Sequence, residues 1–368
     1  MTSSTLEHCF QALDALSEEF QIEQIERPGF AGIFSCMHAK SGLEAILSLH
    51  DLTLGPALGG VRCYPYSSQN EALSDVMNLS RAMTHKAAAS GLPIGGGKSV
   101  LCAESSKLSS TALRAFGRFI DAFSGQYIAA KDVGIGISEL QEIRKATEYV
   151  AGWSRDIGGP SKFTAWGVVA GIEVSLEQVF GSSSCKGKTI AIQGLGGVGM
   201  ALAEFLFWKG AQLIVSDTDP QKARFCAERF SAQVVSKDAL LFVPCDVLSP
   251  CALGGVLFEE NIGSVRAKIV AGGANNILAS PQVADEMDKR GILYAPDYII
   301  NAGGLIRLVT EKLAGVNDPL QGKCRVEEIA STLRSIYDVA RVQKISTMAA
   351  ADLLVAERLR QGRASNAH

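Results

Sequence analysis

A lysine and an aspartate stand where their side chains could carry protons to and from a small molecule. Lys98 directly follows three glycines at 95–97, which let another group approach the backbone closely, so we expect a short rigid loop that holds this lysine. Asp132 ends the apolar run that begins at Tyr127. Burial lowers the pKa of a lysine until it can act as a base near neutral pH, and a carboxylate can complete the proton relay. The alternatives are a plain turn and a capping aspartate; the P-loop pattern fails, because no glycine lies five residues before Gly97.

A second lysine lies on a predicted helix, residues 70–89. The apolar side chains of this segment recur at helical spacing, at Ala72, Val76, Leu79, Met83 and Ala87. Lys86 falls on the side of Leu79 and Met83, which predicts that it faces the interior. The alternative is a lysine whose stem lies along apolar surface while its ammonium reaches water.

A glycine-rich turn in the second half of the chain has the spacing of a dinucleotide site. The apolar run 189–193 predicts a strand, Gly194, Gly196 and Gly199 follow at once as G-x-G-x-x-G, and a helix is expected from Met200. The first glycine allows the tight turn, the second lets the backbone approach a pyrophosphate, and the third lets helix and strand pack closely. The helix N-terminus then offers N–H groups to the anion.

An aspartate in register with this turn favours NAD over NADP. Asp217 ends the predicted strand 212–216 and lies 23 residues after Gly194, where its carboxylate can accept hydrogen bonds from ribose hydroxyls. A 2′-phosphate would meet a like charge there. Lys222 and Arg224 are the nearby cations that argue the other way.

Eight segments, in order and over roughly residues 30 to 310, resemble the Glu/Leu/Phe/Val dehydrogenase family, and the likeness is nearest to its shorter leucine, phenylalanine and tryptophan branch. They are 54–62 (LGPALGGVR), 81–86 (RAMTHK), 95–98 (GGGK), 131–134 (KDVG), the glycine turn 194–199, 250–255 (PCALGG), 271–276 (AGGANN) and 297–304 (DYIINAGG). This sequence departs from the branch at His85, where an aromatic residue is expected, at Lys131, where an acid is expected, and at Ile135.

The resemblance implies a role for each of these segments. Lys86 would bind the substrate carboxylate, Lys98 would polarise the keto or imine carbon and the attacking water, and Asp132 would shuttle protons at the amine. Further substrate contacts are expected at Leu58, Gly59, Gly60, Met83, Ala130, Ile299, Ile300 and Asn301. Cofactor contacts are expected at Gly194, Gly196, Gly197, Val198, Gly199, Asp217, Thr164, Cys251, Ala252 and Asn275. The implied reaction is NAD-dependent oxidative deamination by a homo-oligomer.

The expected side-chain pocket is apolar, which favours a hydrophobic amino acid over glutamate. Leu58 and the two isoleucines favour a branched chain such as leucine or valine. The segment 158–164 is shorter than in leucine enzymes and leans toward phenylalanine or tryptophan. Hydrophobic pockets discriminate by only about 1–3 kcal/mol per methylene, so both alternatives stand. A non-catalytic NAD-binding regulator is the alternative of another class, which the retained lysines and aspartate oppose. A hydroxy-acid dehydrogenase is disfavoured, because the five histidines offer no evident catalytic His–carboxylate pair.

The elements around these residues predict two α/β domains with a cleft between them. Residues 1–150 carry early, closely spaced strands and would form the substrate-binding and oligomerisation domain. Residues 151–325 alternate strands and helices, which is typical of a doubly wound parallel sheet, here a Rossmann NAD-binding domain. A linker is expected at 152–167, and the helices of 326–368 are expected to pack back on the first domain.

Composition excludes several other classes. With 35 basic and 38 acidic residues the net charge is -3, which gives no electrostatic footprint for nucleic acid or an anionic membrane. No apolar run approaches the length of a transmembrane helix, and the N-terminus lacks the pattern of a secretory signal. The nine cysteines form no C-x-x-C pair, so no metal site is expected and a reducing cytoplasm is the simplest location.

Overall fold

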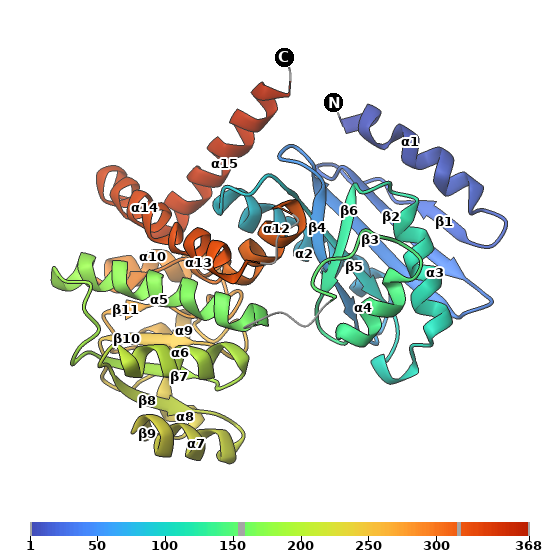
Figure 1. Cartoon of the computed structure of the whole chain (residues 1–368). Helices are drawn as coiled ribbons and strands as arrows, with labels where there is room; N and C mark the ends of the chain where they lie inside the picture. Colours follow the sequence, from blue (N-terminus) through green and yellow to red (C-terminus); the bar gives the residue numbers. More distant parts are fainter. Residues whose placement is uncertain (1, 154–158, 315–317, 367–368) are drawn as a thin grey trace. The chain divides into compact units, whose positions relative to one another are not determined.

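The computed structural model describes residues 2–153, 159–314 and 318–366. The chain divides into two compact units, the first made of Met1–Asp156 with Val355–His368 and the second of Ile157–Leu354 (Figure 1). Of the linker expected at 152–167, residues 154–158 lie outside the described residues. The remainder differs from expectation, because a long helix already begins at Gly159.

The first unit is built on a six-stranded mixed sheet. Its strands are β1 (Gln21–Gln24), β2 (Gly32–His38), β3 (Leu43–Asp51), β4 (Ala57–Cys63), β5 (Gly95–Leu101) and β6 (Tyr127–Lys131). The spatial order is β1-β2-β3-β5-β4-β6. Strands β1, β2, β3 and β5 pair antiparallel in turn, whereas β4 runs parallel to both β5 and β6. The carboxyl ends of β4, β5 and β6 therefore lie at the same edge.

Helices cover both faces of this sheet. They are α1 (Thr2–Ala15), α2 (Gln69–Ala89), α3 (Ser110–Asp121) and α4 (Ile137–Arg144). On one face α1, α3 and α4 pack over a core that includes Phe34, Phe116 and Phe123. On the other face α2 packs against a smaller apolar cluster that includes Ile46 and Val100.

The buried face of α2 differs in part from the predicted apolar stripe. Ala72, Val76 and Ala87 are buried as expected, but the stripe continues through Ser80 and Thr84, while Leu79 and Met83 are only half-buried. These small polar residues are satisfied across the interface: Ser80 Oγ lies 2.8 Å from Ser48 Oγ, and Thr84 Oγ1 lies 2.9 Å from His50 Nδ1. Thr84 packs closely against Gly96 of β5, a contact that apolar periodicity alone does not reveal.

The second unit contains a six-stranded parallel sheet in the order β12-β11-β10-β7-β8-β9. Its strands are β7 (Thr189–Gln193), β8 (Gln212–Ser216), β9 (Gln233–Val234), β10 (Val247–Pro250), β11 (Ile269–Val270) and β12 (Leu293–Tyr294). The chain runs outward from β7 to β9 and then resumes at β10 on the other side of β7. This doubly wound order places a topological switch point between β7 and β10, where such folds bind ligands at the carboxyl ends of the strands. The predicted α/β class and the Rossmann sheet are thus confirmed.

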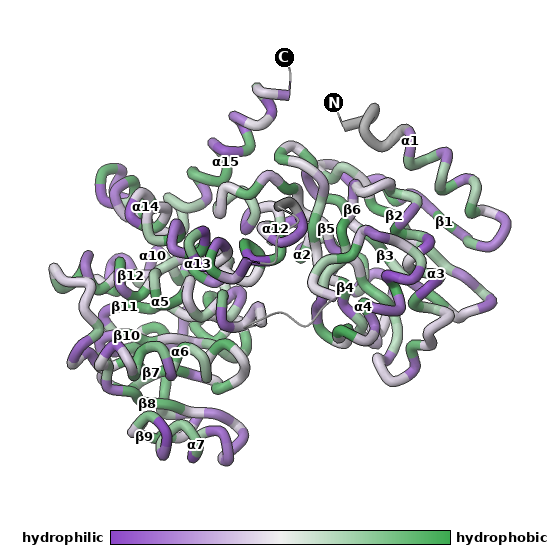
Figure 2. The backbone as a smooth tube through the Cα atoms, in the orientation of Figure 1, coloured by the Kyte–Doolittle hydropathy of each residue, from purple (hydrophilic) through white to green (hydrophobic). Residues whose placement is uncertain are grey.

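The helices of the second unit surround that sheet. They are α5 (Gly159–Phe180), α6 (Gly197–Trp208), α7 (Pro220–Phe230), α8 (Lys237–Leu240), α9 (Glu259–Ile262), α10 (Pro281–Lys289), α11 (Asp297–Ile300), α12 (Gly303–Ala314), α13 (Pro319–Glu327) and α14 (Ile329–Gln343). Figure 2 shows mostly hydrophobic residues along β7 and β8, as expected for strands covered on both faces.

The C-terminal helices are divided between the units. Both α13 and α14 pack on α5, so much of the stretch 326–368 belongs to the second unit rather than the first. The division falls at Val355, within α15 (Thr347–Ser365). From there the chain packs on the first unit, where Arg358 NH1 donates to the carbonyl of Ala88 at 2.8 Å.

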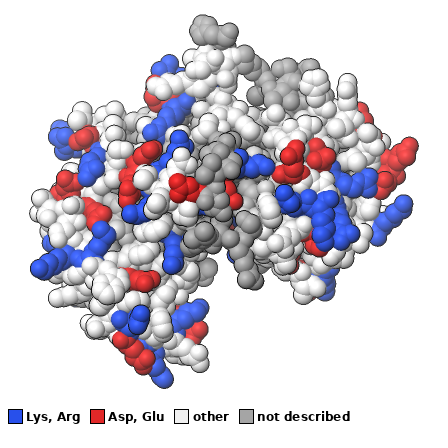
Figure 3. Space-filling view, viewed as in Figure 1, with Lys and Arg blue, Asp and Glu red and all other residues white. Residues whose placement is uncertain are grey.

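The surface carries both signs of charge. Basic and acidic side chains are intermixed over the face in Figure 3, in line with the small net charge. Among the described residues, no helix is long and apolar enough to cross a membrane, and no group of histidine, cysteine and acidic side chains could hold a metal ion.

Candidate active site and dinucleotide site

The central strands of the first unit present the candidate catalytic residues on the face covered by α2. Successive side chains of a strand alternate between faces. On β4, Ala57 and Val61 enter the core under α3, so Leu58, Gly60 and Arg62 lie on the α2 face.

The same alternation places the expected substrate contacts. Lys98 of β5 and Ala130 of β6 lie on the α2 face, as Leu58 and Gly60 do. Gly59 alternates to the opposite face, where its carbonyl accepts a hydrogen bond from the hydroxyl of Tyr127 at 3.0 Å.

Lys98, in the middle of β5, forms a close ion pair with Asp132, which directly follows β6. Lys98 Nζ lies 2.6 Å from Asp132 Oδ2, and the exposed fractions of the two side chains are 8% and 22%. The glycines before Lys98 belong to strand β5 and not to a loop, so the expectation of a loop was wrong. The physical reason is close packing: a Cβ at Gly97 would lie 2.9 Å from the ring of Tyr127, and one at Gly96 would collide with the backbone of Thr84 on α2.

Burial and pairing shift both pKa values of the ion pair. Burial lowers the pKa of Lys98, although the Asp132 carboxylate acts in the opposite direction. Burial opposes ionisation of Asp132, but Lys98 and Arg62 together outweigh it and lower the pKa of that carboxyl. The pair therefore combines an amine that gives up its proton more easily than an exposed lysine with a carboxylate that stays ionised.

Gly60 leaves the space that this pair occupies. A Cβ at Gly60 would lie 3.1 Å from Lys98 Nζ and 2.7 Å from Asp132 Cβ. Any larger residue would push the amine and the carboxylate out of line, so the glycine is required by close approach.

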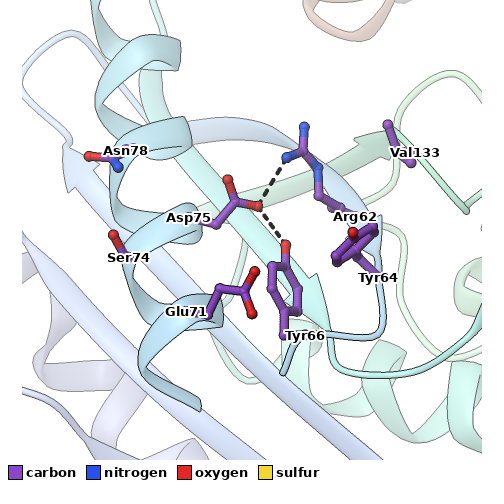
Figure 4. Close-up of a pocket in the computed structure, with 8 residues that line it drawn as sticks. All are labelled: Arg62, Tyr64, Tyr66, Glu71, Ser74, Asp75, Asn78 and Val133. Carbon is purple, nitrogen blue, oxygen red and sulfur yellow. Dashed lines mark hydrogen bonds and ion pairs between the residues drawn. The ribbon is translucent and has the colours of Figure 1, made fainter. Parts of the chain in front are cut away.

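A charged network continues behind Asp132. Arg62 Nε donates to Asp132 Oδ2 at 3.1 Å, and Arg62 NH1 lies 3.0 Å from Asp75 Oδ2. The hydroxyl of Tyr66 donates to the same Asp75 oxygen at 2.5 Å. Arg62, Asp75 and Tyr66 border a cavity of about 520 Å³ that is also lined by Tyr64, Glu71, Ser74, Asn78 and Val133 (Figure 4).

Lys86 lies at the margin of the α2 interface. It is half-buried, as Met83 is, whereas Thr84 packs directly against Gly96 two residues before Lys98. Lys131 is exposed, in agreement with an outward orientation next to Asp132.

The glycine turn of the second unit joins β7 to α6. Gly194 has a φ of +89°, which disfavours other residues, and a Cβ at Gly199 would collide with the carbonyl of Gly194. A Cβ at Gly196 would meet nothing within 4 Å, so the turn has open space above its second glycine. Helix α6 starts at Gly197, followed by Val198, and the N–H groups of a first helical turn lack intrahelical acceptors.

Asp217 is held beside that turn. Its Oδ2 accepts a hydrogen bond from the backbone N–H of Leu195 at 2.6 Å, and its Oδ1 accepts from the N–H of Asp219 at 2.8 Å. Each carboxylate oxygen can accept more than one hydrogen bond, so the group can still bind hydroxyls. Open space over the turn, a helix N-terminus and a carboxylate at the tip of β8 fit an NAD molecule.

Two more expected cofactor contacts, Cys251 and Ala252, follow β10 directly. Ala252 Cβ would lie 2.7 Å from a Cβ at Gly194, so this segment borders the turn across the switch point. Cys251 N–H donates to the carbonyl of Gln193 at 2.7 Å, and burial raises the pKa of its thiol. A raised pKa disfavours the thiolate, which is the nucleophilic form of a cysteine.

Asn301, Asn275 and Thr164 are the remaining expected polar contacts of the second unit. Asn301 Nδ2 donates to the carbonyl of Ala274 and to Asn275 Oδ1, both at 3.1 Å. The buried Oδ1 of Asn301 has no hydrogen-bond partner among the described residues, which leaves an acceptor for a bound molecule. Thr164 Oγ1 accepts from the N–H of Gly304 at 3.2 Å.

Ile299 and Ile300 end α11 and are both buried. The side chain of Ile300 packs against α5, where a Cβ at Gly171 would lie 2.5 Å from its Cγ2. Ile300 therefore has a packing contact within the unit, whatever else it touches.

Comparison with known proteins agrees with these sites. The family model described as Glu/Leu/Phe/Val dehydrogenase, dimerisation domain, matches residues 34–149, and the model described as Glutamate/Leucine/Phenylalanine/Valine dehydrogenase matches residues 221–359. The leucine dehydrogenase of Geobacillus stearothermophilus is 41% identical over 91% of this chain and 92% of its own length. The chain belongs to the Glu/Leu/Phe/Val dehydrogenase family. The predicted family is thus confirmed.

Two further comparisons place the chain within this family. The L-tryptophan dehydrogenase of Nostoc punctiforme is 39% identical over 93% of this chain and 97% of its own length. The crystal structure of L-tryptophan dehydrogenase from the same organism superposes with a TM-score of 0.81 and 36% identity, over 95% of this chain and 99% of that one. Members of the Glu/Leu/Phe/Val dehydrogenase family are NAD(H)-dependent enzymes with a Rossmann domain.

Arg62 and Asp75 belong to the site, although neither was predicted from the sequence. Arg62 was part of the segment 54–62 that resembles the family, but no role was assigned to it. It lies two residues after Gly60, so both residues are on the same face of β4. Asp75 precedes Lys86 by 11 residues, about three helical turns, and so shares its side of α2. Strand and helix periodicity applied to charged residues would have found both.

Proposed function

We propose that this chain catalyses the reversible, NAD-dependent oxidative deamination of a hydrophobic L-amino acid to a 2-oxo acid, ammonia and NADH. The observation that carries the proposal is the ion pair of Lys98 and Asp132, 2.6 Å apart beside Gly60. Regulators that only bind a dinucleotide have no need of a buried amine with a lowered pKa.

The candidate site residues have separate tasks in this reaction. Lys86 binds the substrate carboxylate and fixes the direction of the Cα–H bond. When bound, NAD supplies the acceptor for the hydride that leaves Cα, held by the glycine turn, Asp217, Cys251, Ala252, Asn275 and Thr164. Loss of hydride turns the amine into an iminium, whose carbon is then open to water.

The two proton carriers complete the deamination. Neutral Lys98 takes a proton from the attacking water as the C–O bond forms at Cα. Asp132 takes and returns protons at the substrate nitrogen until it leaves as ammonia and the carbonyl forms. Asn301 Oδ1, the buried acceptor without a partner, offers a contact for the substrate amine.

The preferred substrate is a branched aliphatic amino acid such as leucine or valine. Leu58 and Ala130 support this, because they share the sheet face of Lys98 and present only hydrocarbon. Met83, Ile299 and Ile300 remain predicted pocket residues. An aromatic substrate is the second candidate, which the likeness to the tryptophan dehydrogenase favours.

A panel of L-amino acids with NAD, followed by the absorbance of NADH, tests the proposal. We expect turnover with leucine and valine, weaker turnover with phenylalanine and tryptophan, and none with glutamate. Faster turnover with tryptophan than with leucine would make an aromatic amino acid the preferred substrate. If no amino acid reduces NAD while the protein still binds it, the non-catalytic alternative holds.

We further propose a homo-oligomer in the cytoplasm. The family model over residues 34–149 is that of a dimerisation domain, which supports an oligomer. All nine cysteines are free thiols, which supports a reducing compartment. Light scattering during gel filtration gives the oligomeric state.

A further inference from the structure

One carboxylate oxygen of the candidate site receives two cations. Asp132 Oδ2 lies 2.6 Å from Lys98 Nζ and 3.1 Å from Arg62 Nε. Arg62 then reaches Asp75, whose Oδ2 also accepts the hydroxyl of Tyr66. The four ionisable groups thus alternate in sign, as amine, carboxylate, guanidinium and carboxylate (Figure 4 shows the outer part).

The four groups come from separate parts of the first unit. Lys98 is on β5, Asp132 follows β6, Arg62 is on β4 and Asp75 is on α2. The exposed fractions are 24% for the Arg62 side chain and 29% for that of Asp75, so water screens these charges only in part. Beyond Arg62 the cavity of about 520 Å³ begins, so the outer end of the network is more accessible than Lys98.

The two outer charges act on Lys98 in opposite directions. The positive charge of Arg62 lowers the pKa of Lys98, whereas the negative charge of Asp75 raises it. Both effects are smaller than those of burial and of Asp132. Burial lowers the pKa of Arg62, but the carboxylates of Asp132 and Asp75 outweigh burial and raise it. The guanidinium therefore remains charged.

We propose that Arg62 and Asp75 are positioning residues, which hold Asp132 against Lys98 and set the pH range in which that pair works. Arg62 binds the same oxygen of the Asp132 carboxylate as Lys98 does and so fixes its position. Asp75 keeps Arg62 in place and balances its charge. The kinetic test of this inference rests on the proposed deamination. The contacts among Lys98, Asp132, Arg62 and Asp75 do not depend on that proposal.

Other titratable groups lie on the elements packed around the pair. Strand β6 carries Tyr127, whose pKa burial raises, and the exposed Lys131. Helix α2 carries four further charged or titratable residues besides Asp75, namely Glu71, Arg81, His85 and Lys86. Tyr66 donates to Asp75, and burial raises the pKa of its hydroxyl. Strand β3 carries His50, whose pKa burial lowers to about 4. Tyr127 and His50 are therefore neutral throughout the working range.

The test compares the pH dependence of kcat/KM for Arg62→Gln, Asp75→Asn and the double variant. Deamination rises with pH as Lys98 loses its proton, so the position of this acid limb reports the pKa of the amine. We expect the limb to move up by about 0.5–1 pH unit in Arg62→Gln and down by a smaller amount in Asp75→Asn. The double variant should lie between the wild type and Arg62→Gln, and Arg62→Lys should restore most of the limb position.

Glu71→Gln is the matched control. Glu71 lines the same cavity, but its carboxylate accepts hydrogen bonds from Ser67 and does not touch the network. This variant should leave the limb unchanged. Loss of rate at every pH without a shift, or shifts of both single variants in the same direction, would overturn the proposal and leave only a structural role.

A titration without turnover separates this inference from the proposed function. The rate at which Lys98 reacts with acetic anhydride is measured by mass spectrometry as a function of pH in the same variants. The midpoint of this reaction should move up in Arg62→Gln and down in Asp75→Asn, whether or not any amino acid is oxidised. Identical midpoints in all variants would overturn the proposal even if the wild type proves to be a dehydrogenase.

Discussion

The candidate site of the first unit consists mainly of charged side chains, whereas that of the second unit consists mainly of backbone groups. In the first unit, charged side chains from two strands, a helix and the residue after a third strand converge, and each depends on its neighbours for charge balance. In the second unit, a turn, a helix start and backbone N–H groups form the site, and one carboxylate fixes its edge. We infer that chemistry in the first unit is sensitive to pH and to single charges, whereas binding in the second depends mainly on open space along the backbone.

The largest expected effect comes from removing the amine. Lys98→Ala should lower kcat by about 10³-fold or more, because it removes the base. The affinity for NAD, measured by calorimetric titration, should stay unchanged, since all expected cofactor contacts lie in the other unit. Lys107→Ala, which replaces an exposed lysine of the first unit, is the control. Full turnover by Lys98→Ala would remove the assigned mechanism.

A pair of glycine substitutions sharpens the comparison. In Gly60→Ala the new methyl group crowds Lys98 Nζ and Asp132 Cβ, so kcat should fall by about 10–100-fold while NAD affinity is kept. In Gly196→Ala the methyl group has room in the protein, so the thermal midpoint should not change, but it fills the space expected for the pyrophosphate. Its Kd for NAD should rise by about tenfold, a loss of about 1.4 kcal/mol. If Gly196→Ala binds NAD with the affinity of the wild type, the glycine turn is not the pyrophosphate site.

The smallest expected effect concerns the choice of cofactor. Asp217→Asn keeps an acceptor for the N–H of Leu195 but loses the negative charge. The KM for NAD should rise by a few-fold, up to about tenfold, and the preference for NAD over NADP should fall, because the like charge that repels a 2′-phosphate is gone. Initial rates with both cofactors measure this ratio. An unchanged ratio would mean that Lys222 or Arg224 decides the choice instead.

Much of the fold could be predicted from the sequence, because local patterns dictate it. The parallel strands of the second unit and the turn after β7 follow from short apolar runs and glycine spacing, and both were found. The start of α5 at Gly159 was missed, since glycine and proline at its first positions suggest a linker. Strand β5 was mistaken for a loop, because three consecutive glycines have low strand propensity and only tight packing against α2 makes them favourable there.

The candidate site was predictable in its parts but not in its connections. Lys98, Asp132 and Gly60 were selected by type and by family segments, and they do lie together. The contact of Arg62 with both Asp132 and Asp75 was not foreseen, because it joins positions 70 and 13 residues apart that meet only through the sheet. Similarly, small polar residues of α2 rather than its larger apolar ones pack on β5, which depends on the glycines opposite them.

The sequence by itself determined the residue types, the two sets of elements and the dinucleotide turn, since each depends on neighbours a few positions away. Only the tertiary structure decided which charges share a carboxylate oxygen and how deeply Lys98 is buried. The physical reason is that pKa and ion pairing depend on burial and on distances through space, and strand pairing sets these distances over long separations in the chain.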